Sequence, residues 1–406
     1  MEKVIVIGAG PAGMMASIMA SKAGKDVILL DGNERVGKKL FITGKGRCNV
    51  TNSKDISDFF DFIIGNPTFL YSALYSFTNE DTIRFFENQG IKLKTERGGR
   101  VFPASDKSSD IIKGLLNKLN EEKVDVRLNS RVTKLISNGE YIEAVEINNE
   151  KILKGDKFII ATGGVSYPLT GSKGDGLNFS KKLGHEIIDL KPSLVPIELK
   201  DKFEKEMLGL TLKNIGINLL TENNKSIYKD NGEIQLTAYG LNGPLILKAS
   251  RYIKENSKNT IIIDLKPALT TEELDLRIQK DFKKYINKSF KNSLNDLLPQ
   301  KIINYIIRLS NINEDKKVNE ITKEERKNLV KLMKNISLEV KGLRPIEEAI
   351  VTAGGISVKE IDPSTMKSKL IKNLSFAGEV IDVDAFTGGY NVQIALSTGY
   401  LAGMNI

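Results

Sequence analysis

The chain has 406 residues, of which 40% are hydrophobic and 27% charged, as expected for a soluble globular protein of two or three domains. No apolar run approaches the ~20 residues of a membrane span, and the N-terminus leads directly into a predicted strand, which argues against a signal peptide. One cysteine and one histidine exclude an internal disulfide framework and argue against a zinc site. We therefore expect a cytoplasmic protein without a bound metal or a membrane partner.

The N-terminal segment follows the pattern of a dinucleotide-binding βαβ unit. A β-branched apolar run over 3–7 precedes the motif GAGPAG, a predicted helix over 14–23 and a second strand over 27–30 that ends at Asp31. The motif's glycines permit a tight turn, a close approach to a pyrophosphate and packing of the helix on the strand. An acid after the second strand suits ribose hydroxyls and would repel a 2′-phosphate, which excludes NADP as the dinucleotide bound here.

A loop rich in glycine and basic residues follows this unit. It contains the sequence GKKLFITGKGRCNVTN, whose backbone N–H groups can wrap phosphates or a ring. A surface loop without a function seldom contains so many special residues. The loop is therefore a candidate part of the same binding site.

The remaining pattern predicts a sheet domain that an insertion interrupts. Helices are expected over 67–89 and over 109–120, the latter capped by Ser105, and further strands over 124–128, 131–136, 144–147 and 157–160. From Lys191 the chain changes to short strands until about 267 and to helices over about 272–337. The sheet domain then resumes with a strand and glycine turn over 349–356, a strand over 374–382 and a final helix over 392–402. The expected domains are 1–190 with 345–406, and 191–344.

The excess positive charge lies in the insertion. Residues 191–344 contain 29 Lys and Arg against 20 Asp and Glu, a net charge of +9, whereas the rest contains 31 of each. A solvated lysine-rich surface and a face that binds a polyanion such as RNA are both consistent with this excess. If the helix that starts near 272 continues, one basic stripe would consist of Arg277, Lys280, Lys284, Lys288 and Lys291.

Together these motifs resemble the BaiN-like bacterial flavoproteins, also named aminoacetone-oxidase-type FAD-binding proteins, which are distantly similar to glutathione reductase. The resemblance rests on GAGPAG with its acid, GKKLFITGKGRCNVTN, GRVFPAS, ATGG, TAGGI and AGEVIDVDAFTGGYNVQIA. It covers both ends of the sheet domain, and the insertion only in length and element order. It implies an α/β fold: a glutathione-reductase-type FAD-binding Rossmann domain with an inserted β-rich plus helical domain.

The resemblance implies FAD as the cofactor and assigns residues to it. GAGPAG and Asp31 would hold the ADP half, the loop would pass along the isoalloxazine ring, and the N-terminus of the last helix would face the flavin pyrimidine carbonyl. The full set is Gly8, Gly10, Pro11, Ala12, Gly13, Asp31, Lys39, Thr43, Gly44, Gly46, Arg47, Cys48, Asn49, Val132, Thr162, Gly163, Gly378, Glu379, Gly389, Tyr390 and Asn391.

Members of the family are linked to reduction of a C=C bond conjugated to a carbonyl. Hydride goes to the β-carbon and an acid protonates the α-carbon, so the acid must be protonated near pH 7. Cys48 and Tyr390 are the candidates, although Cys48 has an equal interpretation as a small buried residue that shapes the pocket. A single cysteine excludes dithiol–disulfide chemistry within one chain. His185 is expected to be structural.

Three functions remain open. The leading one, favoured by the localised charge, is reduction of a uridine of large-subunit ribosomal RNA to dihydrouridine. NAD(P)H would then dock transiently, because the insertion has no second GxGxxG. The second is a small-molecule oxidoreductase, either a bile-acid-type enone reductase or an aminoacetone-type amine oxidase. The third is an RNA-binding assembly factor in which FAD is structural.

Overall fold

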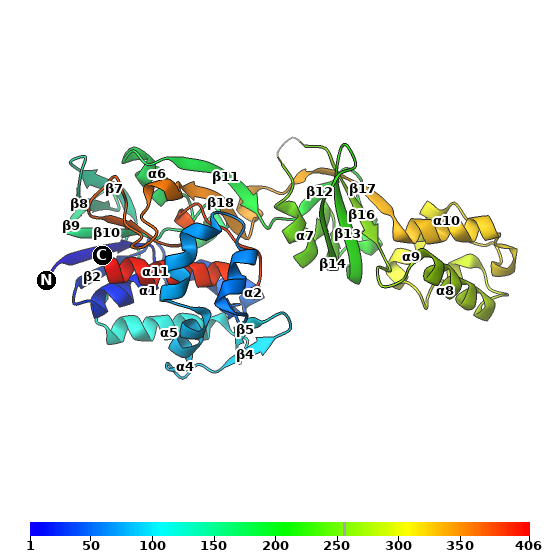
Figure 1. Ribbon diagram of the computed structural model, residues 1–406, viewed down its shortest axis with the longest axis horizontal. Helices are drawn as coiled ribbons and strands as arrows, with labels where there is room; N and C mark the ends of the chain where they lie inside the picture. The colour runs from blue at the N-terminus through cyan, green and yellow to red at the C-terminus, as the bar shows by residue number, and fades with distance from the viewer. Residues whose placement is uncertain (255–256) are drawn as a thin grey trace. The chain divides into compact units, whose positions relative to one another are not determined.

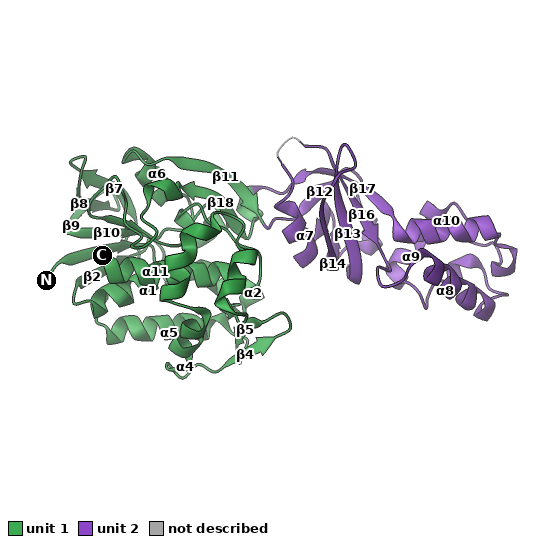
Figure 2. Cartoon of the chain, viewed as in Figure 1, with its two compact units in different colours: residues 1–193, 346–406 green, residues 194–345 purple. Residues whose placement is uncertain are grey.

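The computed structural model describes residues 1–254 and 257–406. Over these residues the chain divides into two compact units (Figure 2). The first unit comprises residues 1–193 and 346–406, and the second comprises residues 194–345. Within the described ranges, none of the helices combines the length and the hydrophobicity needed to cross a membrane.

A five-stranded parallel sheet forms the centre of the first unit, with the strand order β19-β10-β1-β2-β6. Val4, Ile5 and Val6 of the central strand are fully buried, as expected for a parallel sheet covered on both faces. The strands are β1 (Lys3–Ile7), β2 (Asp26–Leu30), β6 (Asp125–Arg127), β10 (Lys157–Ile160) and β19 (Leu374–Phe376).

Three helices cover one face of this sheet: α1 (Pro11–Lys22), α5 (Ser108–Glu121) and α11 (Tyr390–Asn405) (Figure 1). A Cβ at Gly399 of α11 would collide with the backbone oxygen of Ala12. Glycine at this position therefore allows the middle of α11 to approach the start of α1 at backbone distance.

Smaller antiparallel sheets complete the first unit. One contains β7 (Val132–Ser137), β8 (Ile142–Ile147) and β9 (Lys151–Lys154), another β3 (Thr51–Asn52), β4 (Leu93–Glu96) and β5 (Arg100–Pro103), and a third β11 (Ile187–Ser193) and β18 (Val351–Ile356). The predicted glycine turn after 353 is wrong. Gly354 and Gly355 belong to β18 and have positive φ. Glycine is needed at 354 because a side chain there would collide with the β11 backbone.

Two local predictions in the first unit are also wrong. The single helix expected over 67–89 is divided into η2 (Pro67–Leu70), α3 (Tyr71–Ser76) and α4 (Asn79–Glu87). The break falls at Thr78, which caps α4 through a capping box with Asp81. Ser105 does not cap α5, because its hydroxyl donates to the Asp110 carboxylate instead. The other α-helices of the first unit are α2 (Lys38–Gly46) and α6 (Asp175–Lys182), and the 3₁₀ segment η1 (Ile56–Phe62) precedes η2.

The second unit combines a closed barrel with a helical part. The barrel order is β12-β15-β14-β13-β16-β17, and all its pairings are antiparallel. Its last strand, β17, follows the helices in sequence and closes the barrel between β12 and β16. The strands are β12 (Ile197–Leu199), β13 (Thr211–Thr221), β14 (Ser226–Thr237), β15 (Gly240–Asn242), β16 (Asn259–Asp264) and β17 (Ile336–Leu343).

The helices of the second unit bury one apolar stripe each. On α8 (Thr271–Lys284) the residues Leu274, Ile278 and Phe282 are buried, at the spacing expected for one helix face. A capping box of Thr270 and Glu273 fixes where this helix begins. The other helices are α7 (Pro244–Ser250), α9 (Gln300–Ser310) and α10 (Lys323–Lys334).

Candidate cofactor and active site

The GAGPAG turn between β1 and α1 is fixed by close backbone packing. Gly8 has φ +105°, and a Cβ there would lie 2.5 Å from the Ala161 carbonyl oxygen. A Cβ at Gly13 would collide with the carbonyl oxygen of Gly8. By contrast, a Cβ at Gly10 would meet nothing within 4 Å, and no side chain caps α1. The start of α1 therefore offers free N–H groups to an anion, as a pyrophosphate requires.

The Asp31 carboxylate links this turn to the following loop. Its Oδ2 accepts a hydrogen bond from the Ala9 N–H at 2.7 Å, and its Oδ1 accepts bonds from the backbone and side chain of Asn33, both at 2.8 Å. A carboxylate can accept about four hydrogen bonds, so one further donor, such as a ribose hydroxyl, can still bind.

A second part of the predicted site centres on Lys39 and Glu379. The Lys39 ammonium lies 2.7 Å from Glu379 Oε2 and 2.6 Å from the Ser166 hydroxyl. Glu379 Oε1 also accepts a bond from the Thr352 N–H at 2.8 Å. Both charged side chains are about one-fifth exposed, at 21% and 20%. The pair therefore joins α2, β18 and the segment after β19, and Gly163 lies directly beside it.

Gly378, next to Glu379, brings this second part to the glycine turn. Gly378 has φ +76°, and a Cβ there would lie 2.8 Å from the Ala12 side chain. The C-terminal AGE segment and the start of α1 therefore touch, although they are far apart in the sequence. The structure thus brings the phosphate turn and the Lys39–Glu379 pair into one region.

Two predicted cofactor residues carry buried polar atoms without a hydrogen-bond partner among the described residues. These atoms are Asn49 Oδ1 and Thr162 Oγ1. An unsatisfied buried polar group costs about 1–3 kcal/mol, so each calls for a partner that the protein itself does not supply. A bound cofactor that offers polar atoms would satisfy both, and the residues present therefore fit FAD.

Neighbouring segments fix the position of the start of α11, but no side chain binds its first N–H groups. A side chain at Gly389, with φ +100°, would collide with the Thr51 backbone. The Asn391 side chain binds both the N–H and the carbonyl oxygen of Ala385, at 3.0 and 2.7 Å. No side chain caps α11, so its positive end is available to an electron-rich group.

Gln393 supports this helix start and was not predicted. Its Oε1 accepts bonds from the hydroxyls of Thr51 and Thr82 at 2.7 and 2.8 Å. Its amide donates to the Phe77 carbonyl oxygen at 3.0 Å. Nothing in the sequence pattern marked this glutamine, because α11 also contains Asn391, Ser397 and Thr398, and the full burial of Gln393 is visible only in the structure.

Tyr390, a predicted acid, is the first residue of α11 and is only 2% exposed. Its ring stacks on Phe62 at 4.6 Å and meets the edge of Phe59 at 4.9 Å. Burial, with a smaller contribution from the negative charge of Asp58, raises the pKa of the Tyr390 phenol to about 12. The phenol is therefore protonated at neutral pH, as a proton donor must be.

Cys48, the other predicted acid, is fully buried and adopts φ +58°, which is uncommon for a residue other than glycine. Burial raises the pKa of its thiol to about 12, and a hydrogen bond with Thr43 opposes the shift. The kink of α2 at Thr43, Gly44 and Lys45 places the thiol in the interior. The thiol is therefore protonated at neutral pH, as the Tyr390 phenol is, and its full burial is consistent with both interpretations, a proton donor and a packing residue.

The other predicted residues of the α2 region occupy different surroundings. The Arg47 guanidinium lies 4.2 Å from the centre of the Phe102 ring and pairs with Glu96 and Asp106. A Cβ at Gly46 would meet nothing within 4 Å, so open space adjoins it. Val132 is buried at the start of β7.

The predicted basic stripe of the insertion is wrong. Helix α8 ends at Lys284, so Lys288 and Lys291 lie beyond it. Arg277 pairs with Asp281 at 3.0 Å, Lys284 with Asp296 and Lys291 with Asp315, both at 2.7 Å. In and directly after α8, the exposed lysines for which no carboxylate partner is found among the described residues are Lys280, Lys283 and Lys288.

His185 is buried and takes part in a small polar cluster. Its Nδ1 lies 3.0 Å from Glu360 Oε2, and its Nε2 lies 3.0 Å from the Ser368 hydroxyl. Burial lowers the pKa of His185 and outweighs the opposing effect of Glu360. None of these three residues belongs to the predicted cofactor set.

This protein is an FAD-dependent oxidoreductase. The class follows from the parallel Rossmann sheet with its glycine-rich phosphate turn and from the similarity to named relatives. Residues 2–405 match the family described as "HI0933-like protein Rossmann domain". The chain belongs to this family, which confirms both the predicted family resemblance and the predicted fold class.

The relatives with assigned names share the whole length of the chain. A 3-dehydro-bile acid delta(4,6)-reductase of Clostridium scindens is 30% identical over 415 residues, covering 99% of this chain and 98% of the relative. A ribosomal RNA dihydrouridine synthase of Haemophilus influenzae is 30% identical over 406 residues, with the same coverage. The enzyme of that name from Escherichia coli is 28% identical over 403 residues, covering 99% and 97%.

Two solved structures share the fold. A 3-ketosteroid delta1-dehydrogenase from Sterolibacterium denitrificans has a TM-score of 0.50 at 13% identity, covering 99% of both chains. A quinol-fumarate reductase has a TM-score of 0.51 at 15% identity, covering 99% of this chain and 70% of the other. At these identities the likeness concerns the fold alone.

Proposed function

We propose that this protein reduces a C=C bond conjugated to a carbonyl, and that its favoured substrate is a uridine of large-subunit ribosomal RNA. The observation that carries the proposal is similarity, over the whole chain, to relatives named for producing dihydrouridine and for reducing a bile acid. Both names describe saturation of a carbon–carbon double bond. The +9 net charge of residues 191–344 favours the polyanionic substrate.

The residues of the first unit would bind and orient the cofactor. The glycine turn and the free N–H groups of α1 would hold the pyrophosphate, and Asp31 would accept a ribose hydroxyl. The open N-terminus of α11 would face the flavin ring and favour negative charge there. FAD, when bound, supplies the hydride, and we propose NAD(P)H as its transient reductant.

The proton donor in this proposal is Tyr390. Its position at the first turn of α11 places it at the helix end proposed to face the flavin, and its raised pKa keeps it protonated. Cys48 would shape the floor of the pocket, because its thiol is fully buried. The solvent-excluding Phe59–Phe62–Tyr390 cluster would keep water away from the reacting carbon.

A second candidate is reduction of a small-molecule enone. The Clostridium scindens relative is as similar to this chain as the Haemophilus influenzae relative is. In addition, three of the five predicted RNA-binding residues pair with carboxylates, which reduces the charge available to phosphates.

Ribosomal RNA from a strain that lacks the gene distinguishes the two. Nucleosides from its large-subunit RNA should lack a dihydrouridine that a plasmid copy restores, whereas a copy with Gly13→Val should not restore it. An unchanged nucleoside digest would overturn the RNA assignment in favour of the small-molecule enone.

A further inference from the structure

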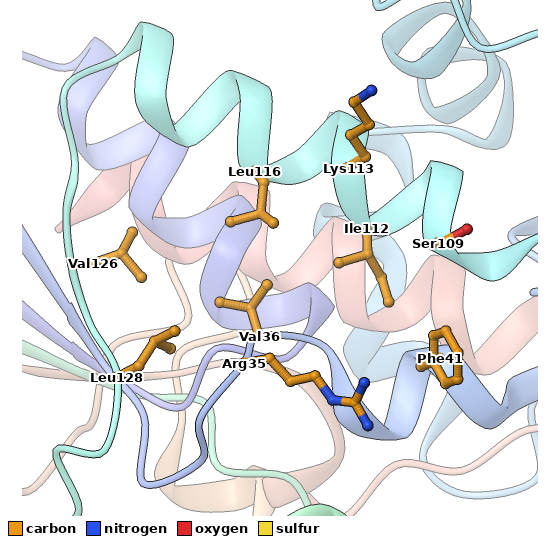
Figure 3. Close-up of a pocket in the computed structure, with 9 residues that line it drawn as sticks. All are labelled: Arg35, Val36, Phe41, Ser109, Ile112, Lys113, Leu116, Val126 and Leu128. Atoms are coloured by element: carbon orange, nitrogen blue, oxygen red, sulfur yellow. The ribbon is translucent and has the colours of Figure 1, made fainter.

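A pocket of about 260 Å³ lies in the first unit, on the side of β6 where α5 and the segment 35–41 meet (Figure 3). None of the predicted cofactor residues lines it. Its volume is slightly below the ~300–1,000 Å³ typical of small-molecule sites. The pocket can therefore hold a short chain or a single ring system.

The interior of this pocket is apolar, and the cationic side chain of Arg35 lies at its margin. Figure 3 shows side chains from α5, β6 and the segment after β2 converging on one space, with the Arg35 guanidinium on one side near Phe41 and the Lys113 ammonium directed away from that space on the opposite side. No acidic residue lines it. The apolar lining consists of Val36, Phe41, Ile112, Leu116, Val126 and Leu128.

The Arg35 guanidinium is available to a ligand. It lies 3.6 Å from the Glu34 carboxylate, but both side chains are more than half exposed, and such a surface pair contributes little. Its other contact is with the Phe41 ring, 5.4 Å away, and Phe41 is itself 43% exposed. A cation beside an exposed ring and an apolar cavity suits a carboxylate that carries a hydrocarbon chain.

We propose that this pocket binds an amphiphilic carboxylate, with the chain in the cavity and the carboxylate at Arg35. A neutral or cationic amphiphile would leave the positive charge of Arg35 unmatched. The pocket also adjoins α2, since Val36 and Phe41 flank the segment that carries Lys39. Occupancy would therefore lie next to the proposed cofactor site without sharing a residue with it.

The test is calorimetric titration of the FAD-loaded protein with octanoate, beside octanol and octylamine as probes of the same chain length. Octanoate should bind saturably and at least tenfold more tightly than either probe. Arg35→Gln should weaken octanoate binding about tenfold, and Leu116→Trp, which fills the cavity, should abolish it. Lys118→Gln, which removes a cation of α5 outside the pocket, should leave binding unchanged.

A fluorescent variant locates the site if Leu116→Trp fails to fold. The chain contains no tryptophan, so Phe41→Trp provides a single emitter at the pocket margin. Its emission should change as octanoate binds and not when octylamine is added. Equal binding of all three probes, an unchanged emission, or octanoate binding that occurs only without FAD would overturn the proposal.

Discussion

The two units of this protein differ in how strictly their sequences constrain residue identity. In the first unit, backbone segments approach each other so closely that only glycine fits, as at Gly8, Gly13 and Gly399. In the second unit a barrel and three longer helices are specified mainly by apolar periodicity. A close backbone approach also occurs there, since a Cβ at Gly240 would lie 2.5 Å from the Ile197 carbonyl oxygen, but it lies between two barrel strands. A Cβ at Gly232 would make only ordinary contacts, at 3.7 Å or more. A cofactor site that depends on close backbone approach can therefore be recognised from sequence motifs. A binding surface can be recognised only from the amino-acid composition of its segment.

Substitution in the glycine turn should have the greatest effect, which is the loss of FAD. Gly13→Val should yield protein without flavin, because its side chain would collide with Gly8. Gly10→Val has room within the protein and should fold while still losing FAD, since its side chain would occupy the cofactor's path. Absorbance of the purified protein and its thermal unfolding measure both properties.

The matched control lies in the second unit. Gly232→Ala should keep both FAD and stability within about 0.5–1 kcal/mol. Full flavin content in Gly10→Val would show that the open space at Gly10 is not the cofactor's path.

The next effect concerns proton transfer. Tyr390→Phe should slow substrate reduction ~10²–10⁴-fold while leaving flavin reduction by the donor nearly unchanged. Because the pKa of the phenol is raised to about 12, the step should show no ionisation of the acid between about pH 6 and pH 9. Stopped-flow measurement of the two half-reactions separates them.

Cys48→Ala is the comparison for this step. If the thiol only packs, the variant should lose stability rather than turnover. A slowed substrate half-reaction in Cys48→Ala, with normal rates in Tyr390→Phe, would reverse the two roles.

A moderate effect is expected at the Lys39–Glu379 pair. Lys39→Met leaves the Glu379 carboxylate without its ammonium partner and should weaken FAD binding roughly tenfold, because a hydrogen bond to a charged group contributes ~1.5–3 kcal/mol. Fluorescence titration with FAD measures the change. Additive losses in Lys39→Met, Glu379→Gln and the double variant would show that the pair does not act as a unit.

In the second unit, the expected effect on RNA is of similar size and is confined to unpaired lysines. Changing Lys280, Lys283 and Lys288 to glutamate should weaken RNA binding about tenfold at moderate salt and lower its salt dependence, since phosphate contacts release counterions. Lys258→Glu, a change to an exposed lysine that pairs with Glu222, serves as the control. Equal affinity in the triple variant and the wild type would assign these lysines to a solvated surface.

The smallest effect is on pH-dependent stability. Burial lowers the pKa of His185, so below the unfolded value of ~6.5 the unfolded chain binds a proton that the folded chain does not. The free energy of unfolding should therefore fall as the pH drops from 7 to 5.5, by about 1 kcal/mol or less from this group. His185→Asn should flatten that part of the profile, and an unchanged profile would refute the assignment.

The parts of the fold that could be predicted from the sequence are those in which close packing restricts which residue type fits. GAGPAG, the acid at 31 and the final helix with its GGYN start are sufficient to indicate the Rossmann sheet. The strand β17 and the break at Thr78 were not predicted, because closing a barrel or ending a helix depends on distant partners and on local capping. The basic stripe failed for a related reason: charge spacing does not show where α8 ends or which acids lie nearby.

The most direct test of the proposed function is a reaction of the purified FAD-loaded protein with unmodified large-subunit ribosomal RNA and NAD(P)H, followed by mass analysis of the nucleosides. A uridine should gain two hydrogens, and this product should disappear with Tyr390→Phe at the same reaction time. Consumption of NAD(P)H with no dihydrouridine in the RNA would contradict the proposed function.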